Sequence, residues 1–322
     1  MKPLLCFGEA LIDFLHTGSA QVDGLNLPVF RQFPGGAPAN VAVAFSRLGG
    51  QSFFAGQVGS DVFGKFLEES LTHYGVDTRF LHKHLSAHTA LAFVTLDNDG
   101  DRSFEFYRDS TADVLFSTDQ ISDTWFAEGP MFHVCSNTLT NAEIAAVTRQ
   151  ALERASQAGC AISFDANLRP GLWAGGKVDR VACDAVARSA DIIKLAREEF
   201  DFLANGSNTH YAEKLLAGAT SLIVVTDGGG PVEFFTRHGR GIVETPKVEV
   251  VDTTAAGDAF TAGMLRGLCA ASKLHSVADD VQSVELLLDF AIRCGSLTTT
   301  RAGAFPSLPT FEEVAEYWSD MP

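Results

Sequence analysis

The chain has 322 residues and a formal net charge of −16. A negative charge of this size repels a phosphate backbone, so composition argues against general nucleic-acid binding. Apolar residues make up 46% of the sequence and charged residues 20%, which is typical of a globular protein with a large core and excludes a disordered chain.

The six cysteines are widely scattered and form no CxxC pair. This spacing predicts neither a zinc site nor a redox motif, and it favours buried thiols in a reducing compartment. Lys2 and the apolar residues after it resemble the start of a signal peptide, but Glu9 and Asp13 interrupt what would be its apolar segment. No uninterrupted apolar run is long enough to span a bilayer. We therefore expect a soluble, cytoplasmic protein without a membrane partner.

Short apolar runs alternate with segments of helical periodicity along most of the chain. The runs that predict buried strands are 4–8, 52–56, 131–135, 161–164, 191–195 and 222–226. The segments that predict helices are 39–48, 63–74, 142–158, 212–216, 258–268 and 281–297. This alternation predicts an α/β fold, in which a mostly parallel sheet carries helices on both faces. Ligands of such sheets bind beyond the carboxyl ends of the strands.

Residues 14–33 and 89–107 break this alternation. Both read as extended antiparallel segments, and apolar and polar residues alternate most clearly over 103–107. Neither segment is followed by a crossover helix. We interpret them as a small β-sheet that projects as a lid from a single domain spanning residues 1–322.

The segment 59–65 nearly spells a phosphate-binding Walker A loop. The motif requires Ser or Thr after its lysine, but Phe66 follows Lys65. Asp61 would also place a carboxylate inside the phosphate site. The segment is therefore interpreted as a strand-to-helix turn.

A second glycine-rich segment runs from Gly35 to Asn40. The pair Gly35 and Gly36 lets a ligand approach the backbone closely, and Pro38 favours the start of a helix. Asn40 then lies one turn into that helix, with an amide that can both donate to and accept from hydroxyl groups. The segment predicts a binding site if other polar groups converge on it.

Residues 252–258 precede an apolar helix and end in the sequence Ala255-Ala256-Gly257-Asp258. Small residues leave backbone N–H groups bare at a helix N-terminus, which suits a phosphoryl group in transfer. Asp258 lies in the first helical turn beside this anion hole. Its alternative role is capping of the helix, but beside an anion hole it is a candidate base for an attacking hydroxyl.

Further polar groups follow the predicted strands. Asp13 lies past the first strand, and Asp165, Asn167 and Arg169 emerge after residues 161–164. Arg108 ends the second extended segment. Each is by itself equally consistent with a charged loop in solvent.

These motifs make the chain resemble the ribokinase-like (PfkB) carbohydrate kinases over essentially its whole length. The resemblance rests on the glycine pair with Asn40 and on residues 252–258. The segments 8–14, 106–108 and 165–173 are most similar to those of fructokinases. The resemblance implies a three-layer α/β/α sandwich with a small projecting β-sheet lid.

The family implies roles for individual residues. The sugar would be bound by Asp13, Gly35, Gly36 and Asn40, with Arg108, Asp165, Asn167 and Arg169 nearby. Asp258 would be the catalytic base, and the anion hole would be the backbone of Ala255, Ala256, Gly257 and Asp258. ATP would lie along Lys194, Thr226, Gly228, Gly230 and Gly303, with residues 291–298 beside the adenine. Mg²⁺ would bridge the phosphates, a monovalent cation is a further expected cofactor, and the lid would form a homodimer interface.

The sequence departs from the family at two places. The usual Gly-Ala-Gly-Asp has become Ala255-Ala256-Gly257-Asp258, and the anion hole survives this change provided that residue 255 avoids a positive φ. The family's Asn-x-x-Glu element aligns with residues 196–199, where Ala196 replaces the Asn and Glu199 remains as an indirect metal support.

The expected activity is therefore an ATP-dependent sugar kinase that phosphorylates free fructose. A 2-keto-3-deoxygluconate kinase is the alternative within the family, because two arginines could pair with the carboxylate of a sugar acid. A non-catalytic sugar-binding paralogue is an alternative of a different class. A nicotinamide dehydrogenase fits the alternation of strands and helices, but the fingerprint loop is missing.

Overall fold

The computed structural model describes residues 1–96, 102–271 and 274–318. The strands of its main sheet are β1 (Leu4–Phe7), β4 (Ser52–Gly59), β5 (Asp77–His84), β8 (Met131–Cys135), β9 (Ile162–Asp165), β10 (Ile192–Ala196), β11 (Leu222–Thr226), β12 (Val232–Thr236) and β13 (Arg240–Val243). They form a nine-stranded sheet in the order β13-β12-β11-β10-β9-β8-β1-β4-β5. From β11 to β5 all neighbours pair in parallel, whereas β12 and β13 extend the β11 edge as antiparallel strands.

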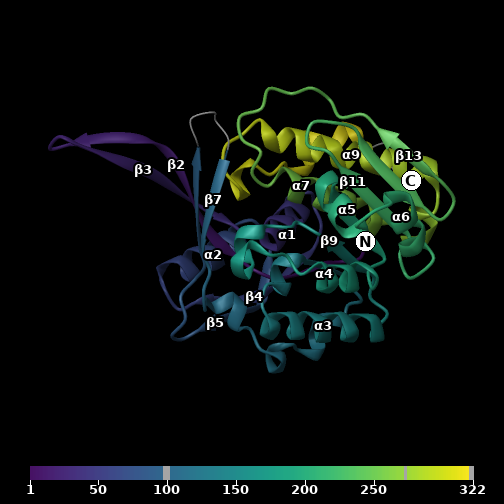
Figure 1. Ribbon diagram of the computed structural model, residues 1–322, viewed down its shortest axis with the longest axis horizontal. Coiled ribbons are helices and arrows are strands. Elements are labelled where there is room, and N and C mark those ends of the chain that lie inside the picture. The colour runs from purple at the N-terminus through teal and green to yellow at the C-terminus, as the bar shows by residue number, and fades with distance from the viewer. Residues whose placement is uncertain (97–101, 272–273, 319–322) are drawn as a thin grey trace.

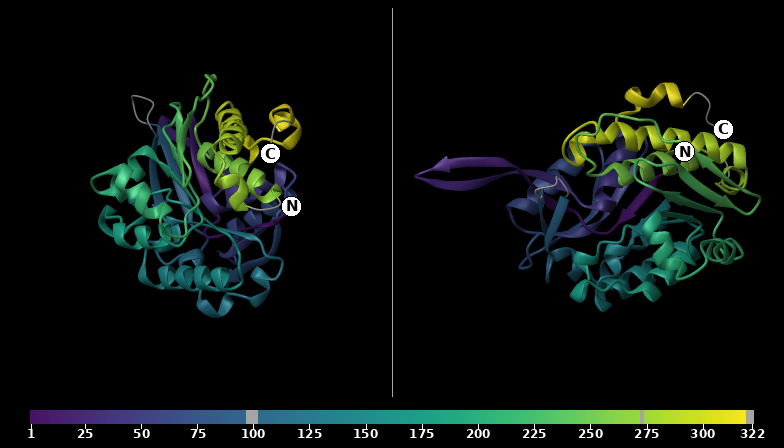
Figure 2. Two further views of the ribbon diagram at one scale, coloured as in Figure 1. Left: turned by 90° about the vertical axis from the view of Figure 1, so that its right-hand side faces the viewer. Right: turned by 45° about the horizontal axis from the view of Figure 1, so that its top comes forward.

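Helices cover both faces of this sheet (Figures 1 and 2). The α-helices are α1 (Ala37–Arg47), α2 (Val62–His73), α3 (Ala142–Gln157), α4 (Arg180–Ala187), α5 (Arg197–Ala204), α6 (Asn208–Leu216), α7 (Ala256–Ala270), α8 (Leu274–Ala278), α9 (Val281–Thr299) and α10 (Phe311–Val314). Short 3-10 helices lie at Ala112–Leu115, Thr118–Gln120, Asp123–Phe126, Ser136–Leu139, Pro170–Leu172, Ala174–Gly176, Phe305–Ser307 and Ala315–Tyr317.

The alternation of side chains along each strand divides the core into two halves. Leu4 and Cys6 of β1 pack in a buried cluster with α1, α7 and α9, whereas Leu5 and Phe7 pack in a second cluster with α3, α5 and α6. The two clusters lie on opposite faces of the sheet. The predicted three-layer α/β/α arrangement with a mostly parallel sheet is therefore confirmed.

The strands predicted at 131–135 and 222–226 match β8 and β11, and the other predicted strands differ from the observed bounds by up to three residues. The sequence pattern did not predict β5, β12 or β13. These strands lie at the two ends of the sheet, and β5 and β13 are only partly buried, so their sequences lack the continuous apolar run of a central strand.

A second, four-stranded sheet has the order β3-β2-β6-β7. Its strands are β2 (Leu11–Val22), β3 (Leu25–Gly35), β6 (Leu91–Leu96) and β7 (Arg102–Tyr107), and residues 97–101 of the predicted second segment lie outside the described residues. The pairs β2–β3 and β6–β7 are antiparallel as predicted, whereas β2 and β6 pair in parallel. Figures 1 and 2 show the tip of the β2–β3 hairpin projecting well beyond the helical layers.

All six cysteines are buried and free, as their spacing in the sequence predicted. Within the described part of the chain, no helix is both long enough and apolar enough to cross a membrane.

Candidate functional site

The carboxyl ends of β1, β8, β9 and β10 open onto a cavity of about 330 Å³, which the first turns of α1 and α7 also border. Its lining residues are Glu9, Leu11, Asp13, Gly36, Ala37, Asn40, Phe104, Phe106, Asn137, Asn167, Arg169, Leu172, Lys194, Thr253, Thr254, Ala255, Gly257 and Asp258. The fold therefore gathers sugar-site candidates from the N-terminal third of the chain with the predicted catalytic segment near its C-terminal end.

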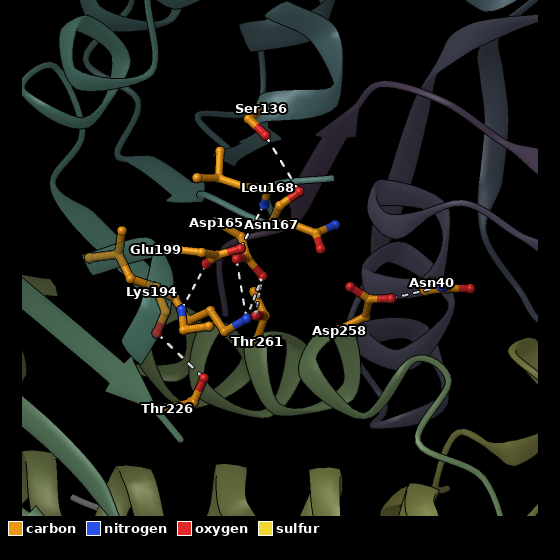
Figure 3. Close-up of polar contacts among 12 residues, drawn as sticks. Asn40, Ser136, Asp165, Asn167, Leu168, Lys194, Glu199, Thr226, Asp258 and Thr261 are labelled. Atoms are coloured by element: carbon orange, nitrogen blue, oxygen red, sulfur yellow. Dashed lines mark hydrogen bonds and ion pairs between the residues drawn. The ribbon is translucent and has the colours of Figure 1, made fainter. Parts of the chain in front are cut away.

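Asn40 and Asp258 face one another at this cavity, although 218 residues separate them in sequence (Figure 3). The Asn40 Nδ2 donates to Asp258 Oδ2 at 2.7 Å. The chain enters α1 through Gly36, whose φ of 104° favours glycine, and Pro38 follows in the first turn. A Cβ on Gly36 would also lie 2.5 Å from the Glu9 carbonyl oxygen. Glycine at position 36 therefore allows the approach that places Asn40 at the cavity.

The pKa values of the Asp258 and Asp13 carboxyl groups are both raised. Burial raises the pKa of Asp258 to about 7, against the opposing effect of the Asn40 hydrogen bond. Burial, and next the negative charge of Asp258, raise the pKa of Asp13 to about 7. Asp13 lies within β2, next to Gly35 of β3, where a Cβ would come within 2.1 Å of Asp13 Oδ2. The glycine at position 35 thus provides room for the Asp13 carboxylate.

The start of α7 provides backbone N–H groups without a side-chain cap. Such groups at a helix N-terminus, together with the helix dipole, bind anions. The anion hole was expected to survive the change to alanine provided that residue 255 avoids a positive φ. This condition is not met, because Ala255 adopts φ 60° and ψ 7°, in the left-handed region. An L-residue pays roughly 1–2 kcal/mol for this conformation. The chain therefore enters α7 through a strained alanine at the position where the family has glycine.

Lys194 and Asp165 form a buried ion pair beside the start of α7 (Figure 3). The Lys194 Nζ lies 3.1 Å from Asp165 Oδ2, which also accepts a hydrogen bond from Thr261 of α7. Although burial acts to lower it, the pKa of Lys194 is raised, chiefly by the Asp165 carboxylate. A Cβ on Gly257 would lie 3.3 Å from Nζ, so the ammonium group lies close to the first turn of α7.

This pair changes the interpretation of Asp165. The carboxylate was expected near the sugar, but it is not among the cavity-lining residues and is engaged by Lys194 and Thr261. Asn167 and Arg169, from the same loop, do line the cavity. Asn167 has a positive φ of 38°, and its carbonyl accepts from Ser136 at 3.4 Å.

Arg108 does not line the cavity that Asp258 lines. Its Nε forms a buried ion pair with Asp113 at 2.5 Å, and its Nη1 donates to the Asn137 carbonyl at 2.9 Å. It borders a neighbouring cavity of about 330 Å³, which shares Phe106 and Leu172 with the first. The structure therefore does not bring Arg108 to the wall of the cavity that Asp258 lines.

Glu199 lies in the first turn of α5 and accepts two backbone hydrogen bonds. Its Oε1 accepts from the Leu168 N–H at 2.6 Å, and its Oε2 accepts from the Ala196 N–H at 2.7 Å. Both oxygens are therefore used by backbone donors. Among the described residues, no group of three or more His, Cys, Asp or Glu side chains is arranged to hold a metal ion.

The remaining nucleotide-site candidates are not among the residues that line the cavity with Asp258. Thr226 ends β11, and its hydroxyl donates to the Leu195 carbonyl at 3.4 Å. Gly228 has a positive φ of 52°, and none of the described atoms lies within 4 Å of where its Cβ would be; the Gly230 N–H donates to the Asp227 carbonyl and closes a turn. Gly303, also at positive φ, donates its N–H to Asp252 at 2.9 Å.

The Walker-like segment is a strand-to-helix turn, as predicted. Asp61 is the N-cap of α2 and accepts from the Gly64 N–H at 2.8 Å. Its second carboxylate oxygen accepts from the Thr89 N–H at 2.8 Å. The carboxylate thus occupies the position where a phosphate would have to bind.

Sequence reasoning missed two buried polar residues at the cavity, Glu9 and Asn137. Glu9 lies two residues after the end of β1, and Asn137 lies two residues after the end of β8. Because ligands bind beyond the carboxyl ends of parallel strands, their positions in the sequence could have identified them as site candidates. A larger cavity of about 400 Å³ lies among α4, α5 and α6, but none of the residues predicted from the sequence borders it.

The chain matches the family model described as pfkB family carbohydrate kinase over residues 1–311. It is 39% identical to a probable fructokinase-7 of Arabidopsis thaliana, with 98% of this chain and 92% of the relative covered. It is also 39% identical to fructokinase-1 of Zea mays, with 97% and 96% covered.

Solved structures agree with this match. A fructokinase from Xylella fastidiosa with bound ATP is 42% identical and superposes with a TM-score of 0.91, with 99% of this chain and 98% of that chain covered. A fructokinase from Vibrio cholerae O395 with fructose, ADP and calcium ion bound is 32% identical, with a TM-score of 0.86, 98% of this chain covered and 99% of that chain. With the convergence of Asn40 and Asp258 at a helix N-terminus, these similarities show that the chain belongs to the pfkB family of carbohydrate kinases.

Proposed function

We propose that this protein is an ATP-dependent fructokinase, which transfers the γ-phosphoryl group of ATP to a hydroxyl of free fructose. The observation that carries the proposal is the hydrogen bond between Asn40 and Asp258 beside the N-terminus of α7, which has no side-chain cap. A base, a hydroxyl-binding amide and an anion hole thus border one cavity. The fructokinases among its relatives support the choice of sugar.

In the proposed mechanism, Asp258 orients the attacking hydroxyl and accepts its proton. As the new oxygen–phosphorus bond forms, the bond between the γ-phosphorus and the oxygen bridging it to the β-phosphate breaks, and ADP leaves. A pKa of about 7 leaves much of the carboxyl ionised near neutral pH, and therefore able to take the proton. The N–H groups at Ala255, Gly257 and Asp258 stabilise the charge on the transferred group, whereas the Ala256 N–H donates to the Thr253 carbonyl at 3.3 Å.

The sugar is proposed to bind against Asp13, Gly35, Gly36, Asn40, Asn167 and Arg169. Asp165 and Arg108 contribute indirectly, because their charges are engaged by Lys194 and Asp113 respectively. This assignment keeps every predicted substrate-site residue at or next to the cavity, but it gives two of them a supporting role.

ATP is proposed to lie along Lys194, Thr226, Gly228, Gly230 and Gly303, with its phosphates toward the start of α7. Mg²⁺ is the proposed metal. Both Glu199 oxygens accept backbone N–H groups, and within the described residues no group of three or more His, Cys, Asp or Glu side chains could hold a metal ion, so this part of the chain does not fit a dedicated metal cage. The metal would therefore be held mainly by the phosphates. A monovalent cation is also proposed, since a relative from Vibrio cholerae has a potassium ion bound.

A coupled ADP-release assay with fructose, ribose, 2-keto-3-deoxygluconate and adenosine tests the proposal. We expect turnover of fructose with a catalytic efficiency at least tenfold above that for the other acceptors. Turnover of 2-keto-3-deoxygluconate but not of fructose would instead identify the sugar-acid kinase. Sugar binding without any ADP release would identify the non-catalytic paralogue.

The charge of the cavity disfavours the sugar acid. The carboxyl groups of Glu9, Asp13 and Asp258 line it, whereas Lys194 is already paired with Asp165. Of the two arginines that would pair with an acid's carboxylate, Arg108 is engaged by Asp113 instead. Only Arg169 remains to bind such a group at the cavity wall.

The projecting sheet is proposed to serve as the lid and as the interface of a homodimer. Leu25, Leu27 and Val29 alternate along β3 and are 63%, 41% and 43% exposed. Apolar side chains on one face of a projecting hairpin favour burial against a second copy. Light scattering after size exclusion should give a dimer for the wild type and a monomer for Leu25→Asp/Leu27→Asp. Val181→Asp, at an exposed apolar residue of α4, is the matched control.

A cytoplasmic location remains our proposal. The six free, buried cysteines support a reducing compartment. One similar relative is named as chloroplastic, so cell fractionation with antibodies against the protein is the appropriate test.

A further inference from the structure

Two buried polar side chains border the cavity at the carboxyl ends of β1 and β8. Glu9 follows β1 and is 1% exposed, and Asn137 lies in the 3-10 helix Ser136–Leu139 and is 3% exposed. The Asn137 Nδ2 donates to Glu9 Oε1 at 2.8 Å, and the Ala37 N–H donates to the same oxygen at 3.2 Å. Glu9 is therefore oriented through one of its two carboxyl oxygens.

The other oxygen of Glu9 lacks such donors. Glu9 Oε2 and Asn137 Oδ1 are both buried, and neither has a hydrogen-bond partner within the part of the chain that the structure describes. A buried polar atom without a partner is costly, so native proteins rarely leave one. Because both residues line the cavity, a bound ligand is in a position to supply the missing partner.

The surroundings hold Glu9 in this orientation. The Glu9 carbonyl lies so close to Gly36 that a Cβ there would come within 2.5 Å, and Arg108 fixes Asn137 through its carbonyl oxygen. Burial raises the pKa of Glu9, and the positive charge of Arg108 opposes this rise. Oε1 of the carboxyl group is thus held by two N–H donors, and Oε2 is left without a protein partner among the described residues.

We propose that Glu9 is a specificity-determining residue, which hydrogen-bonds a hydroxyl of the bound sugar through Oε2, and that Asn137 is the positioning residue that orients it. The hydroxyl would donate to Oε2 of the ionised carboxylate, which can only accept a hydrogen bond. The carboxylate of a sugar acid would bring a second negative charge to Glu9 and Asp13. The inference rests on the proposed sugar-kinase function and deepens it by selecting neutral polyols.

The test is Glu9→Gln, combined with fructose analogues that each lack one hydroxyl. Because the Oε1 position receives two N–H donors, the glutamine oxygen should take that position and its NH₂ should replace Oε2. This replaces an acceptor by a donor. We expect KM for fructose to rise about 10- to 100-fold, with kcat and KM for ATP changed by less than about threefold.

The analogues separate recognition from a structural role. In the wild-type enzyme, one analogue should lose binding by about tenfold or more, and in Glu9→Gln the same analogue should lose less than about threefold. Glu143→Gln, on the exposed first turn of α3, should leave all constants unchanged. Equal losses in wild type and Glu9→Gln for every analogue would overturn the inference, because Glu9 would then contact no hydroxyl.

Failure of the proposed acceptor is distinguishable from failure of this inference. If the wild type phosphorylates a neutral sugar other than fructose, the fructokinase proposal is wrong, and the deoxy analogues of that sugar decide the role of Glu9 by the same criterion. Turnover restricted to 2-keto-3-deoxygluconate would overturn the inference itself, because Glu9 would then face a substrate with a carboxylate.

Discussion

The side-chain amide of Asn40 donates a hydrogen bond to the carboxylate of Asp258 at 2.7 Å, and thereby connects the first turns of α1 and α7. This contact joins the predicted sugar-binding loop to the predicted base. It also opposes the effect of burial, which raises the pKa of Asp258 to about 7. Position and protonation of the proposed base therefore depend on a residue from the other end of the chain.

Replacement of Asp258 by asparagine should remove the base and preserve the shape of the cavity. We expect kcat to fall by about 10²- to 10⁴-fold, because the attacking hydroxyl loses its proton acceptor. KM for the sugar should change by only a few-fold. Steady-state kinetics with the coupled assay provides both values.

Asp184→Asn is the matched control, since Asp184 lies on α4 in an ion pair with Arg188 that does not border the cavity. Its kinetic constants should equal those of the wild type. A normal kcat for Asp258→Asn would rule out the proposed role of this carboxylate.

The pH dependence of kcat should show an acidic limb centred at about pH 7, since burial raises the pKa of Asp258 to about 7. Below this pH the carboxyl is protonated and cannot accept the hydroxyl proton, so activity is lost as the pH falls. Well below the midpoint, kcat should drop by about tenfold per pH unit, as expected for one proton. Above about pH 8 it should be constant.

The carboxyl of Asp13 also has a pKa of about 7, so the limb must be assigned to one of the two groups. Asp13→Asn should weaken sugar binding and retain the acidic limb in kcat. If the acidic limb disappears in Asp13→Asn, then Asp13, and not Asp258, controls activity in this pH range.

Ala255→Gly should stabilise the protein. The left-handed conformation of Ala255 costs roughly 1–2 kcal/mol, which glycine would not incur. Glycine loses more conformational entropy on folding, however, and this lowers the gain in stability by about 0.5–1 kcal/mol. The free energy of unfolding measured in urea should therefore rise by about 0.5–1 kcal/mol. Because the backbone N–H groups are unchanged, kcat should stay within about twofold.

Ala146→Gly, at an exposed position inside α3, is the control for the intrinsic cost of glycine in a helix. It should lower the free energy of unfolding by about 1 kcal/mol. Equal losses in the two variants would show that Ala255 is not strained in solution.

Arg108→Met should lower the free energy of unfolding by about 3–5 kcal/mol, because it leaves the buried carboxylate of Asp113 without its partner. The double variant Arg108→Met/Asp113→Leu should recover much of this loss. Urea denaturation measures both. Arg169 is exposed and lines the cavity, and it forms no ion pair within the part of the chain that the structure describes, so Arg169→Met should change stability little and raise KM for the sugar. Additive losses in the double variant would contradict the ion pair.

The glycine-rich and Asp-containing motifs were recognisable in the sequence because their chemistry is local. Whether a turn admits a positive φ, or whether a small residue bares an N–H group, depends on a few consecutive residues. The Walker-like segment was rejected on the same local basis, and Asp61 indeed caps α2. The left-handed conformation of Ala255 escaped this reasoning, because tertiary packing holds a conformation that its own side chain disfavours.

The sequence by itself determined the alternation of strands and helices, the family and the segment that carries Asp258, since periodicity and short motifs are properties of neighbouring residues. Only the tertiary structure decided which charges remain available at the cavity. Asp165 and Arg108 are engaged by Lys194 and Asp113, whereas Glu9 and Asn137 reach the cavity. Burial makes each unpaired charge costly, so the partners that the fold brings together decide which polar groups remain for a ligand.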